Sequence, residues 1–456
     1  MKFTLDRRGL FMLVFVHGHL AVTRVQISIE WFRLLYFNMK KILLILFTIA
    51  YPIILNATDI VEINGIFYEL KPVKVGTAAV NYDPANVGGK LYKGDVTIPS
   101  TIEYDGNTYK VTEINTYAFM GCRELTSVSL PEGLITIGFG AFDGCSGLTK
   151  INIPSTVTTI DKWAFRDCTA LTGVTITDIS AWCNIAFDDY SNPLYYSHRL
   201  IINDQEVKNL VIPETVTTIA DRAFNGFSEL ESVQFGNGVK TIGKYAFGWC
   251  SSLNSVIVPD EITEIGAAAF YECTALNSLK LSGSLKKIDV ETFAYCNNLE
   301  EIVIPEGILG IANYAFRDCK NLKKIYLPEG LLGIGTAAFG WCENITDVYC
   351  NAKTPPVPID AWYWSTSHFF WESFVDYSSL HVPEDAIADY KTAFSWKDFG
   401  KIVALTSEDT AIKSSTLTPG QSEKYYSVDG QKMSEPHKGF NIIRMSDGKI
   451  RKVILK

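Results

Sequence analysis

A 23-residue repeat is the feature that most constrains the fold of this chain. An Ala-Phe pair first occurs at Ala118 and Phe119. Seven further copies and one Thr-Phe variant follow it, at intervals of 23 residues except across one gap. An isoleucine stands four residues before every copy. Self-similarity at a fixed period predicts a solenoid, because one such unit cannot bury its own apolar face and must stack on its neighbours.

Each unit also contains a short strand pattern. Ile151-Asn152-Ile153 is typical, with two apolar residues facing inward and the middle one facing outward. In five units a proline follows this triplet and ends the strand, since proline cannot donate to a ladder. The same signature occurs before and after the nine units, so we expect a mainly β, α/β-type repeat solenoid of about twelve rungs.

These residues carry a family resemblance. The unit Leu-x-x-Val/Ile-x-Leu/Ile-Pro, followed by Ile-x-x-x-Ala-Phe-x-x-Cys, resembles the BspA-like leucine-rich repeat over about residues 96–383. The resemblance implies a curved leucine-rich-repeat ladder. It also implies a secreted or cell-surface protein, because family members are surface proteins of bacteria and several act in adhesion.

The N-terminal region has the organisation of a signal peptide at residues 39–57. A basic start is followed by fourteen uncharged residues, Ile42 to Leu55, and by the small Ala57 at the expected cut. Fourteen helical residues span roughly 21 Å, less than the ~30 Å of a hydrocarbon core, so we expect no permanent membrane span in the mature chain. Residues 1–38 are interpreted as an extension from a mis-assigned start codon, with an uncleaved anchor as the alternative.

The remaining regions complete the predicted organisation. We expect an N-terminal β cap at 58–110, repeats at 111–351 with an insertion at about 177–208, a C-terminal cap at 352–404, a linker at 405–422 and a small C-terminal β-module at 423–456. The insertion, with Trp182 and Cys183, is expected to have a packing role.

The C-terminal module resembles type IX secretion sorting domains through its Asp-Gly-Gln-Lys and Gly-Phe-Asn-Ile-Ile-Arg-Met runs. That resemblance implies the cell surface of a Gram-negative bacterium; a plain β-module is the alternative.

Eight of the ten cysteines share one repeat position, from Cys122 to Cys342. Phe227 holds that position in the fourth unit, which indicates an apolar environment. We therefore expect buried free thiols rather than disulfides or zinc ligands, because the spacing of 23 suits neither complete pairing nor a zinc site.

Composition and motifs argue against several function classes. The net charge of −9 disfavours nucleic-acid binding. No phosphate loop, nucleophile elbow or zinc-protease motif occurs, so we expect no enzyme and no cofactor.

A stripe on the later strands is the first candidate site. The outward strand position is polar in the first four units but includes large apolar residues in the later ones, with charged residues beside it. Such a surface favours a protein partner, a host or matrix protein; the alternative is plain β propensity. The candidate residues are Ile257, Lys280, Glu301, Val303, Lys324, Tyr326, Asp347 and Tyr349.

An aromatic loop is the second candidate site. Residues 362–371 contain three tryptophans, two phenylalanines and a tyrosine, whose flat faces suit sugars or partner side chains. Folding of these rings onto the last coil is the alternative. The residues are Trp362, Tyr363, Trp364, Phe369, Phe370 and Trp371. The leading hypothesis is thus protein recognition at the bacterial surface, with glycan binding or processing and a structural surface-layer role as rivals.

Overall fold

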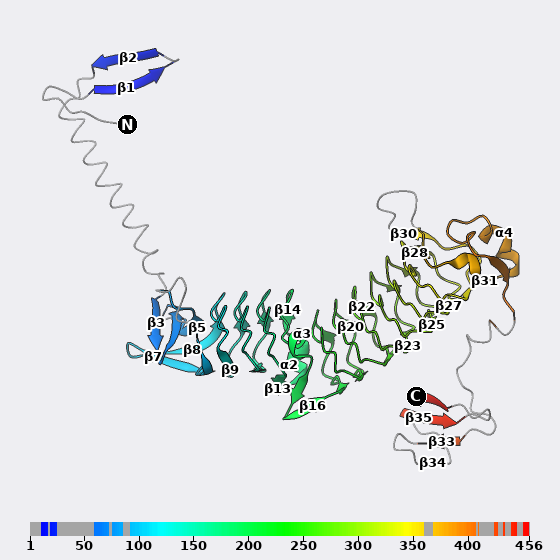
Figure 1. Ribbon diagram of the computed structural model, residues 1–456, viewed down its shortest axis with the longest axis horizontal. Coiled ribbons are helices and arrows are strands. Elements are labelled where there is room, and N and C mark those ends of the chain that lie inside the picture. The colour runs from blue at the N-terminus through cyan, green and yellow to red at the C-terminus, as the bar shows by residue number, and fades with distance from the viewer. Residues whose placement is uncertain are drawn as a thin grey trace. The chain divides into compact units, whose positions relative to one another are not determined.

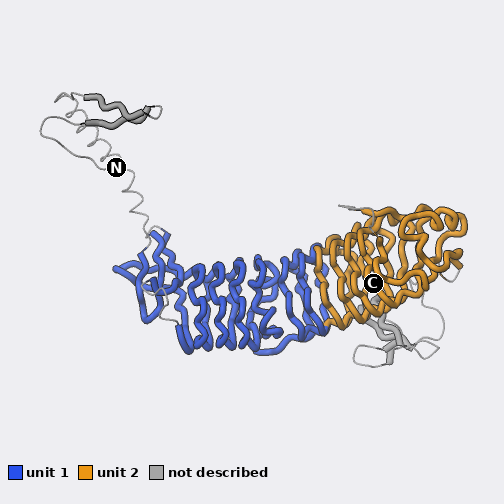
Figure 2. Tube along the Cα trace, turned by 45° about the horizontal axis from the view of Figure 1, so that its top comes forward, with its two compact units in different colours: residues 1–252 blue, residues 253–456 orange. Residues whose placement is uncertain are grey.

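The fold is a mainly β solenoid with few helices, as the repeat predicts (Figure 1). The computed structural model describes residues 11–16, 19–24, 59–72, 75–84, 92–359, 368–406 and 409, and the strands at 424–426, 432–433, 439–444 and 450–455. Two compact units, residues 1–252 and residues 253–456, divide the chain (Figure 2). The signal peptide predicted at 39–57 lies outside the described residues.

In the first unit, a small sheet precedes the repeats in sequence. Antiparallel hairpins turn at Asn64-Gly65 and at Asp105-Gly106, where all four residues adopt the left-handed conformation that two-residue hairpin loops require. The strands are β3 (Asp59–Ile63), β4 (Ile66–Leu70), β5 (Thr77–Asn81), β7 (Thr101–Tyr104) and β8 (Asn107–Ile114). A separate hairpin joins β1 (Phe11–Val16) and β2 (His19–Arg24).

Each repeat of the first unit contributes one strand to each of two parallel ladders. The first ladder comprises β6 (Gly94–Thr97), β9 (Leu125–Ser129), β11 (Lys150–Asn152), β13 (Val174–Ile176) and β15 (Leu200–Ile202). The antiparallel strand β16 (Gln205–Val207) ends this sheet. In the next sheet, β17 (Asn209–Val211) pairs with β19 (Ser232–Gln234). The second comprises β8, β10 (Thr136–Ile137), β12 (Thr159–Ile160) and β14 (Ala186–Phe187), and then β18 (Thr218–Ile219) paired with β20 (Thr241–Ile242).

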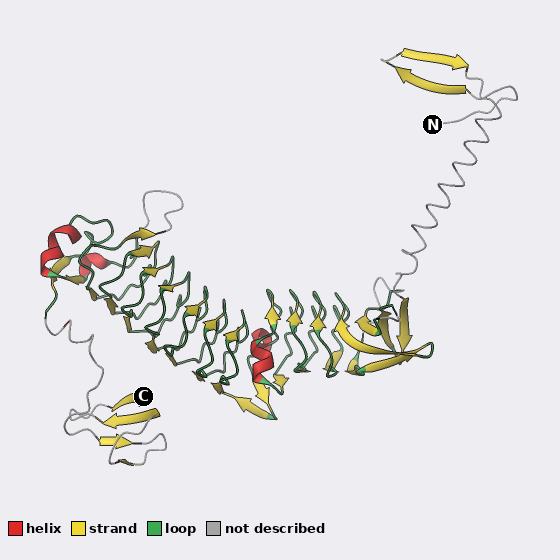
Figure 3. Cartoon of the chain, turned by 180° about the vertical axis from the view of Figure 1, so that it is seen from behind, coloured by secondary structure: helices red, strands yellow, loops and turns green. Residues whose placement is uncertain are grey.

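The second unit repeats this plan. Its first set of strands is β21 (Ser255–Ile257), β23 (Ser278–Lys280), β25 (Glu301–Val303), β27 (Lys324–Leu327), β29 (Asp347–Cys350), β31 (Ser379–Val382) and β32 (Lys401–Ala404). Its second set is β22 (Glu264–Ile265), β24 (Lys287–Ile288), β26 (Gly310–Ile311), β28 (Gly333–Gly335) and β30 (Val357–Ile359). Figure 3 shows these short strands recurring along the unit.

Columns of identical side chains form the core. In the second unit, the rings of Phe270, Phe293, Phe316 and Phe339 stack with centroids 5.2–5.5 Å apart. The first unit has the same column at Phe119, Phe142 and Phe165. In-register parallel strands place equivalent positions directly above one another, so each buried position of the repeat forms a continuous column.

The cysteine column is buried, as predicted; its thiols form no disulfide, and several of them make hydrogen bonds. The Cys319 thiol donates to the carbonyl oxygen of Phe293 at 3.3 Å, and the Cys342 thiol donates to that of Phe316 at 3.2 Å. The same contact joins four other pairs, Cys145–Phe119, Cys168–Phe142, Cys250–Phe224 and Cys296–Phe270. The thiol therefore serves as a donor between coils as well as a small apolar group.

The insertion packs onto the repeats that follow it. It contains α2 (Ile179–Cys183) and α3 (Leu194–Ser197). The indole of Trp182 donates to the carbonyl oxygen of Ala223 at 2.8 Å, and the amide of Asn192 donates to the same oxygen at 2.9 Å. Both side chains are buried, which agrees with the predicted packing role.

The C-terminal cap is closed by aromatic anchors. Tyr390, Trp396 and Phe399 are buried, as the sequence predicts. The cap contains η1 (Val375–Tyr377), η2 (Glu384–Ala386) and α4 (Ile387–Tyr390). Farther along the chain, four antiparallel strands form one sheet in the order β34 (Lys432–Met433), β33 (Lys424–Tyr426), β35 (Gly439–Arg444) and β36 (Ile450–Leu455).

Candidate binding face of the second unit

The predicted stripe forms a continuous row over the last strands of the second unit. Val303 lies opposite Tyr326, Tyr326 lies opposite Tyr349, and the row then continues through His381 to Val403. In the earlier strands, Ile257 lies opposite Lys280. The sequence analysis counted the strand signature at Leu380 to Pro383 as a rung but did not include its His381 in the candidate site. It missed Val403, whose strand carries no such signature.

We call these positions the outward row of the second unit: Ile257, Lys280, Val303, Tyr326, Tyr349, His381 and Val403. Exposure varies strongly along it. Ile257, Val303 and Val403 are 41%, 47% and 39% exposed. Tyr326 and Tyr349 are only 9% exposed each, so little of the aromatic part of the predicted stripe is open to solvent. Their rings stack on one another at 4.6 Å, and the imidazole of His381 stacks on Tyr349 at 4.4 Å. Stacking leaves the ring edges, rather than the faces, as the accessible part of these residues.

Charged side chains run beside the outward row, two residues earlier on each strand. Glu301 lies opposite Lys324, and Lys324 lies opposite Asp347. Alternate residues of a strand share a face, so this charged row borders the aromatic one. The sequence therefore correctly predicted that Glu301, Lys324 and Asp347 lie together.

Two carboxylates flank the imidazole of His381, and only that of Asp347 is within hydrogen-bond distance. Its Nε2 lies 3.1 Å from Oδ1 of Asp347, and its Nδ1 lies 3.8 Å from Oδ2 of Asp409. The hydroxyl and the backbone N–H of Thr406 both donate to that Asp409 oxygen at 2.7 Å. Burial opposes ionisation of Asp409, but the Thr406 hydrogen bonds and His381 outweigh it and lower its pKa.

The two tyrosines remain phenols at neutral pH. Burial, with smaller contributions from Tyr349 and the carboxylates of Glu301, Asp347 and Asp409, raises the pKa of Tyr326 to about 12. Burial also raises the pKa of Tyr349, with Asp347 and Asp409 contributing. Each phenol can thus donate one hydrogen bond to a ligand at the border of an apolar strip.

The aromatic loop separates into core and surface. Phe369 is fully buried and Phe370 is 5% exposed, so both belong to the core rather than to a binding site. The ring of Phe370 continues the phenylalanine column, 5.6 Å from Phe339. Trp371 is 38% exposed. Trp362, Tyr363 and Trp364 lie outside the described residues.

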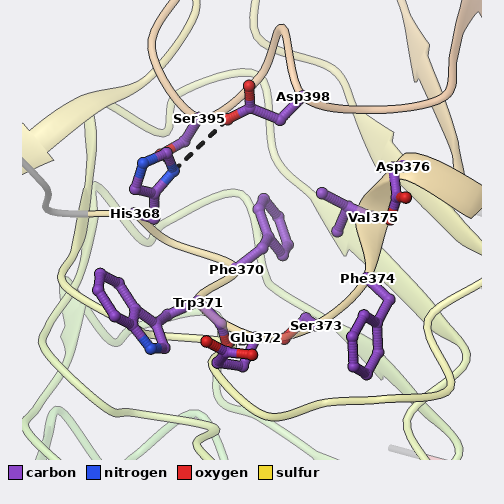
Figure 4. A pocket seen from close by; sticks show the side chains of 10 residues that line it. All are labelled: His368, Phe370, Trp371, Glu372, Ser373, Phe374, Val375, Asp376, Ser395 and Asp398. Atoms are coloured by element: carbon purple, nitrogen blue, oxygen red, sulfur yellow. Dashed lines mark hydrogen bonds and ion pairs between the residues drawn. The ribbon is translucent and has the colours of Figure 1, made fainter.

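Trp371 borders a hollow in the cap (Figure 4). The hollow has a volume of about 340 Å³, and Phe374, Glu372 and Asp376 also line it. Nδ1 of His368 lies 3.4 Å from Oδ2 of Asp398 at its rim. Sequence analysis singled out Trp371 but not the residues around it, because they come from two segments that meet only in the folded cap.

In the described part of the chain, no group of three or more histidine, cysteine or acidic side chains is arranged to hold a metal ion. None of the helices described is both long and apolar enough to cross a bilayer.

Comparisons with solved structures show leucine-rich-repeat proteins. A leucine-rich cell surface protein from Faecalibacterium prausnitzii is 21% identical over 64% of this chain and 94% of its own, with a TM-score of 0.37. A leucine-rich repeat protein from Bacteroides ovatus is 23% identical over 76% of this chain and all of its own, with a TM-score of 0.39. One from Eubacterium ventriosum is 17% identical over 69% and 99%, with a TM-score of 0.41. A search of curated proteins found no match.

The family model gives the assignment. The BspA type leucine rich repeat region matches in six copies, over residues 100–194, 202–308 and 286–367. These matches cover more than half of the chain and coincide with the phenylalanine and cysteine columns. Proteins with this repeat are typically cell-surface proteins of bacteria, and leucine-rich repeats typically bind other proteins without catalysis. The chain belongs to the BspA-type leucine-rich-repeat family.

Proposed function

We propose that this chain is a secreted or surface-attached binding protein that recognises a host or matrix protein with the outward row of its second unit. The observation that supports this is the run from Val303 to Val403, in which exposed valines flank a tight Tyr-Tyr-His stack. A rigid aromatic centre with an apolar border and a charged edge matches the composition of protein interfaces.

The equivalent row of the first unit differs in chemistry. Its outward positions include Ser129, Asn152, Thr175 and Gln234, all of which are polar. The exceptions are Val211, which is 59% exposed, and the partly buried Ile201, which lies opposite Thr175. This contrast supports a partner that engages the second unit, and it supplies a matched control residue on the same kind of strand.

The test is a binding measurement with the purified chain and immobilised extracellular matrix proteins. Val303→Asp places a charge in the outward row and is expected to weaken binding at least about tenfold, roughly 1.4 kcal/mol. Val211→Asp makes the same change at an exposed outward position of β17 and should leave binding unchanged. Capture of no matrix protein, or equal loss in the two variants, would contradict the proposal.

Export completes the proposed function. A cleaved signal peptide at residues 39–57 would deliver the chain to the periplasm of a Gram-negative bacterium, and the C-terminal β-module would direct it to the cell surface. Cell fractionation tests this. The full chain should reach the surface, whereas a chain lacking residues 423–456 should remain in the periplasm.

A further inference from the structure

The hollow in the C-terminal cap has a lining that the repeat does not explain. We propose that it is a binding site for a cationic group, the ammonium or guanidinium of a lysine or arginine side chain on a partner protein. The inference is independent of the outward row, because it concerns other residues and a ligand that can be tested alone.

The aromatic walls are the first observation. Trp371 and Phe374 are 38% and 55% exposed, although the neighbouring Phe369 and Phe370 are buried. In Figure 4, Trp371 and His368 lie on one side of the hollow, and Phe374 and Asp376 lie on the other. Two large rings left in solvent beside a well-packed aromatic core indicate a surface kept open for a ligand.

The charges around these rings are the second observation. The hollow is lined by Glu372, Asp376 and Asp398 and by no lysine or arginine. Asp398 has a partner in His368, at 3.4 Å. Glu372 and Asp376 make no ion pair with any residue in the described part of the chain. Their uncompensated negative charge disfavours anions and favours cations.

Hydrogen-bonding capacity separates a cation from a neutral sugar. Carboxylates only accept hydrogen bonds, and ammonium and guanidinium groups only donate them. A sugar needs donors as well. The hydroxyl of Ser373 already donates to the carbonyl oxygen of Phe339 at 2.6 Å, so the indole N–H of Trp371 is the main neutral donor that the lining offers. A cation over the faces of Trp371 and Phe374, with carboxylates beside it, satisfies the lining more completely.

The size of the hollow limits the ligand. A volume of about 340 Å³ lies at the lower end of small-molecule sites. It accommodates one long side chain presented by a partner, not a whole oligosaccharide. The lining thus fits a single lysine or arginine.

The experiment follows the Trp371 indole signal by NMR in the full chain, assigned with Trp371→Phe. Probes are N-acetyl-lysine amide, N-acetyl-arginine amide, n-butylammonium, N-acetyl-glutamate amide and maltotriose. We expect saturable shifts with the lysine and arginine probes, weaker ones with n-butylammonium, and none with the last two. Equal affinity for n-butylammonium would support the cation site but indicate that its ligand is a free amine rather than a side chain of a partner protein.

Matched variants make the site falsifiable. Glu372→Gln/Asp376→Asn should weaken lysine binding at least fivefold. Glu384→Gln/Asp385→Asn removes the same charge from exposed acids of η2 in the same cap, outside the hollow, and should leave binding unchanged. Equal weakening in both variants, a saturable shift with maltotriose alone, or no saturable shift with any cation would overturn the proposal. Unchanged thermal unfolding midpoints would show that each variant is folded.

Discussion

Tyr326 and Tyr349 lie opposite one another on neighbouring parallel strands, with ring centroids 4.6 Å apart and ring planes inclined by only 7°. His381 extends this stack on the next strand. The same register that builds the buried phenylalanine column therefore builds a second aromatic column on the outward face. Because the rings cover one another, an outward position on this strand face does not imply an exposed ring.

This geometry makes Tyr349 a stabilising residue as well as a surface residue. Tyr349→Ala removes ring contacts to both neighbours, and we expect it to lower the free energy of unfolding by about 2 kcal/mol. Val303→Ala, at a half-exposed position of the same row, should cost less than about 1 kcal/mol. Guanidinium denaturation followed by circular dichroism measures both. Similar losses in the two variants would mean that the stack contributes no stability of its own.

The thiol contacts give a second prediction. Cys319→Ser keeps a donor for the carbonyl oxygen of Phe293, whereas Cys319→Ala removes it. We expect the alanine variant to be less stable than the serine variant by about 1 kcal/mol. The chain contains a natural precedent, because Ser373 donates to Phe339 as the repeat cysteines donate to their phenylalanines. An alanine variant as stable as the serine variant would show that the thiol acts only as an apolar group.

Much of the fold could be predicted from the sequence, because residues that recur at a fixed spacing indicate which positions of neighbouring coils lie opposite one another. The phenylalanine and cysteine columns, the packing of the insertion and the anchors of the cap all follow from residue type and spacing. The last coil was recognised only by its strand signature at Leu380 to Pro383, and its phenylalanine and serine positions were not. Phe370 and Ser373 follow Phe339 and Cys342 by 31 residues, and serine replaces cysteine, so neither the spacing nor the motif marks the coil.

The candidate sites were less predictable for a physical reason. Alternation identifies which side chains face outward, and so it correctly grouped Val303 with Tyr326 and Tyr349. It does not report how much of each ring a neighbour covers. The hollow depends on Asp398 and Trp371 meeting in the cap, which is a tertiary contact without a sequence period.

Two equivalent glycines give a third prediction. Gly307 and Gly330 each follow a Pro-Glu pair in successive repeats. A Cβ on Gly307 would collide with the carbonyl oxygen of Gly283, whereas a Cβ on Gly330 would lie 3.6 Å from that of Glu306, an ordinary contact. Gly307→Ala should destabilise the protein by about 1–3 kcal/mol, and Gly330→Ala should be neutral or stabilise it by up to about 1 kcal/mol. Thermal unfolding of the pair checks this; the reverse order of stabilities would contradict it.

Alkaline pH should destabilise the protein through its buried thiols, and Cys350 allows this to be measured at one site. Burial raises the pKa of the Cys350 thiol from its ordinary 9.0 to about 11, although hydrogen bonds with Tyr390 and Ala352 partly oppose the effect. Above pH 9 the unfolded chain releases this proton while the folded chain keeps it. The contribution to stability is therefore complete below pH 9 and is lost as the pH rises to about 11.

Cys350→Ser removes this titrating group and retains a hydroxyl beside Tyr390, whose Oη lies 3.1 Å from the Cys350 sulfur. Between pH 9 and pH 11, the free energy of unfolding of the original chain should fall more steeply than that of the variant, by about 1 kcal/mol per pH unit. Below pH 9 the two curves should run parallel. Parallel curves across the whole range would show that Cys350 ionises equally in the folded and unfolded chains. Burial of the thiol in the cap would then have no effect on its proton.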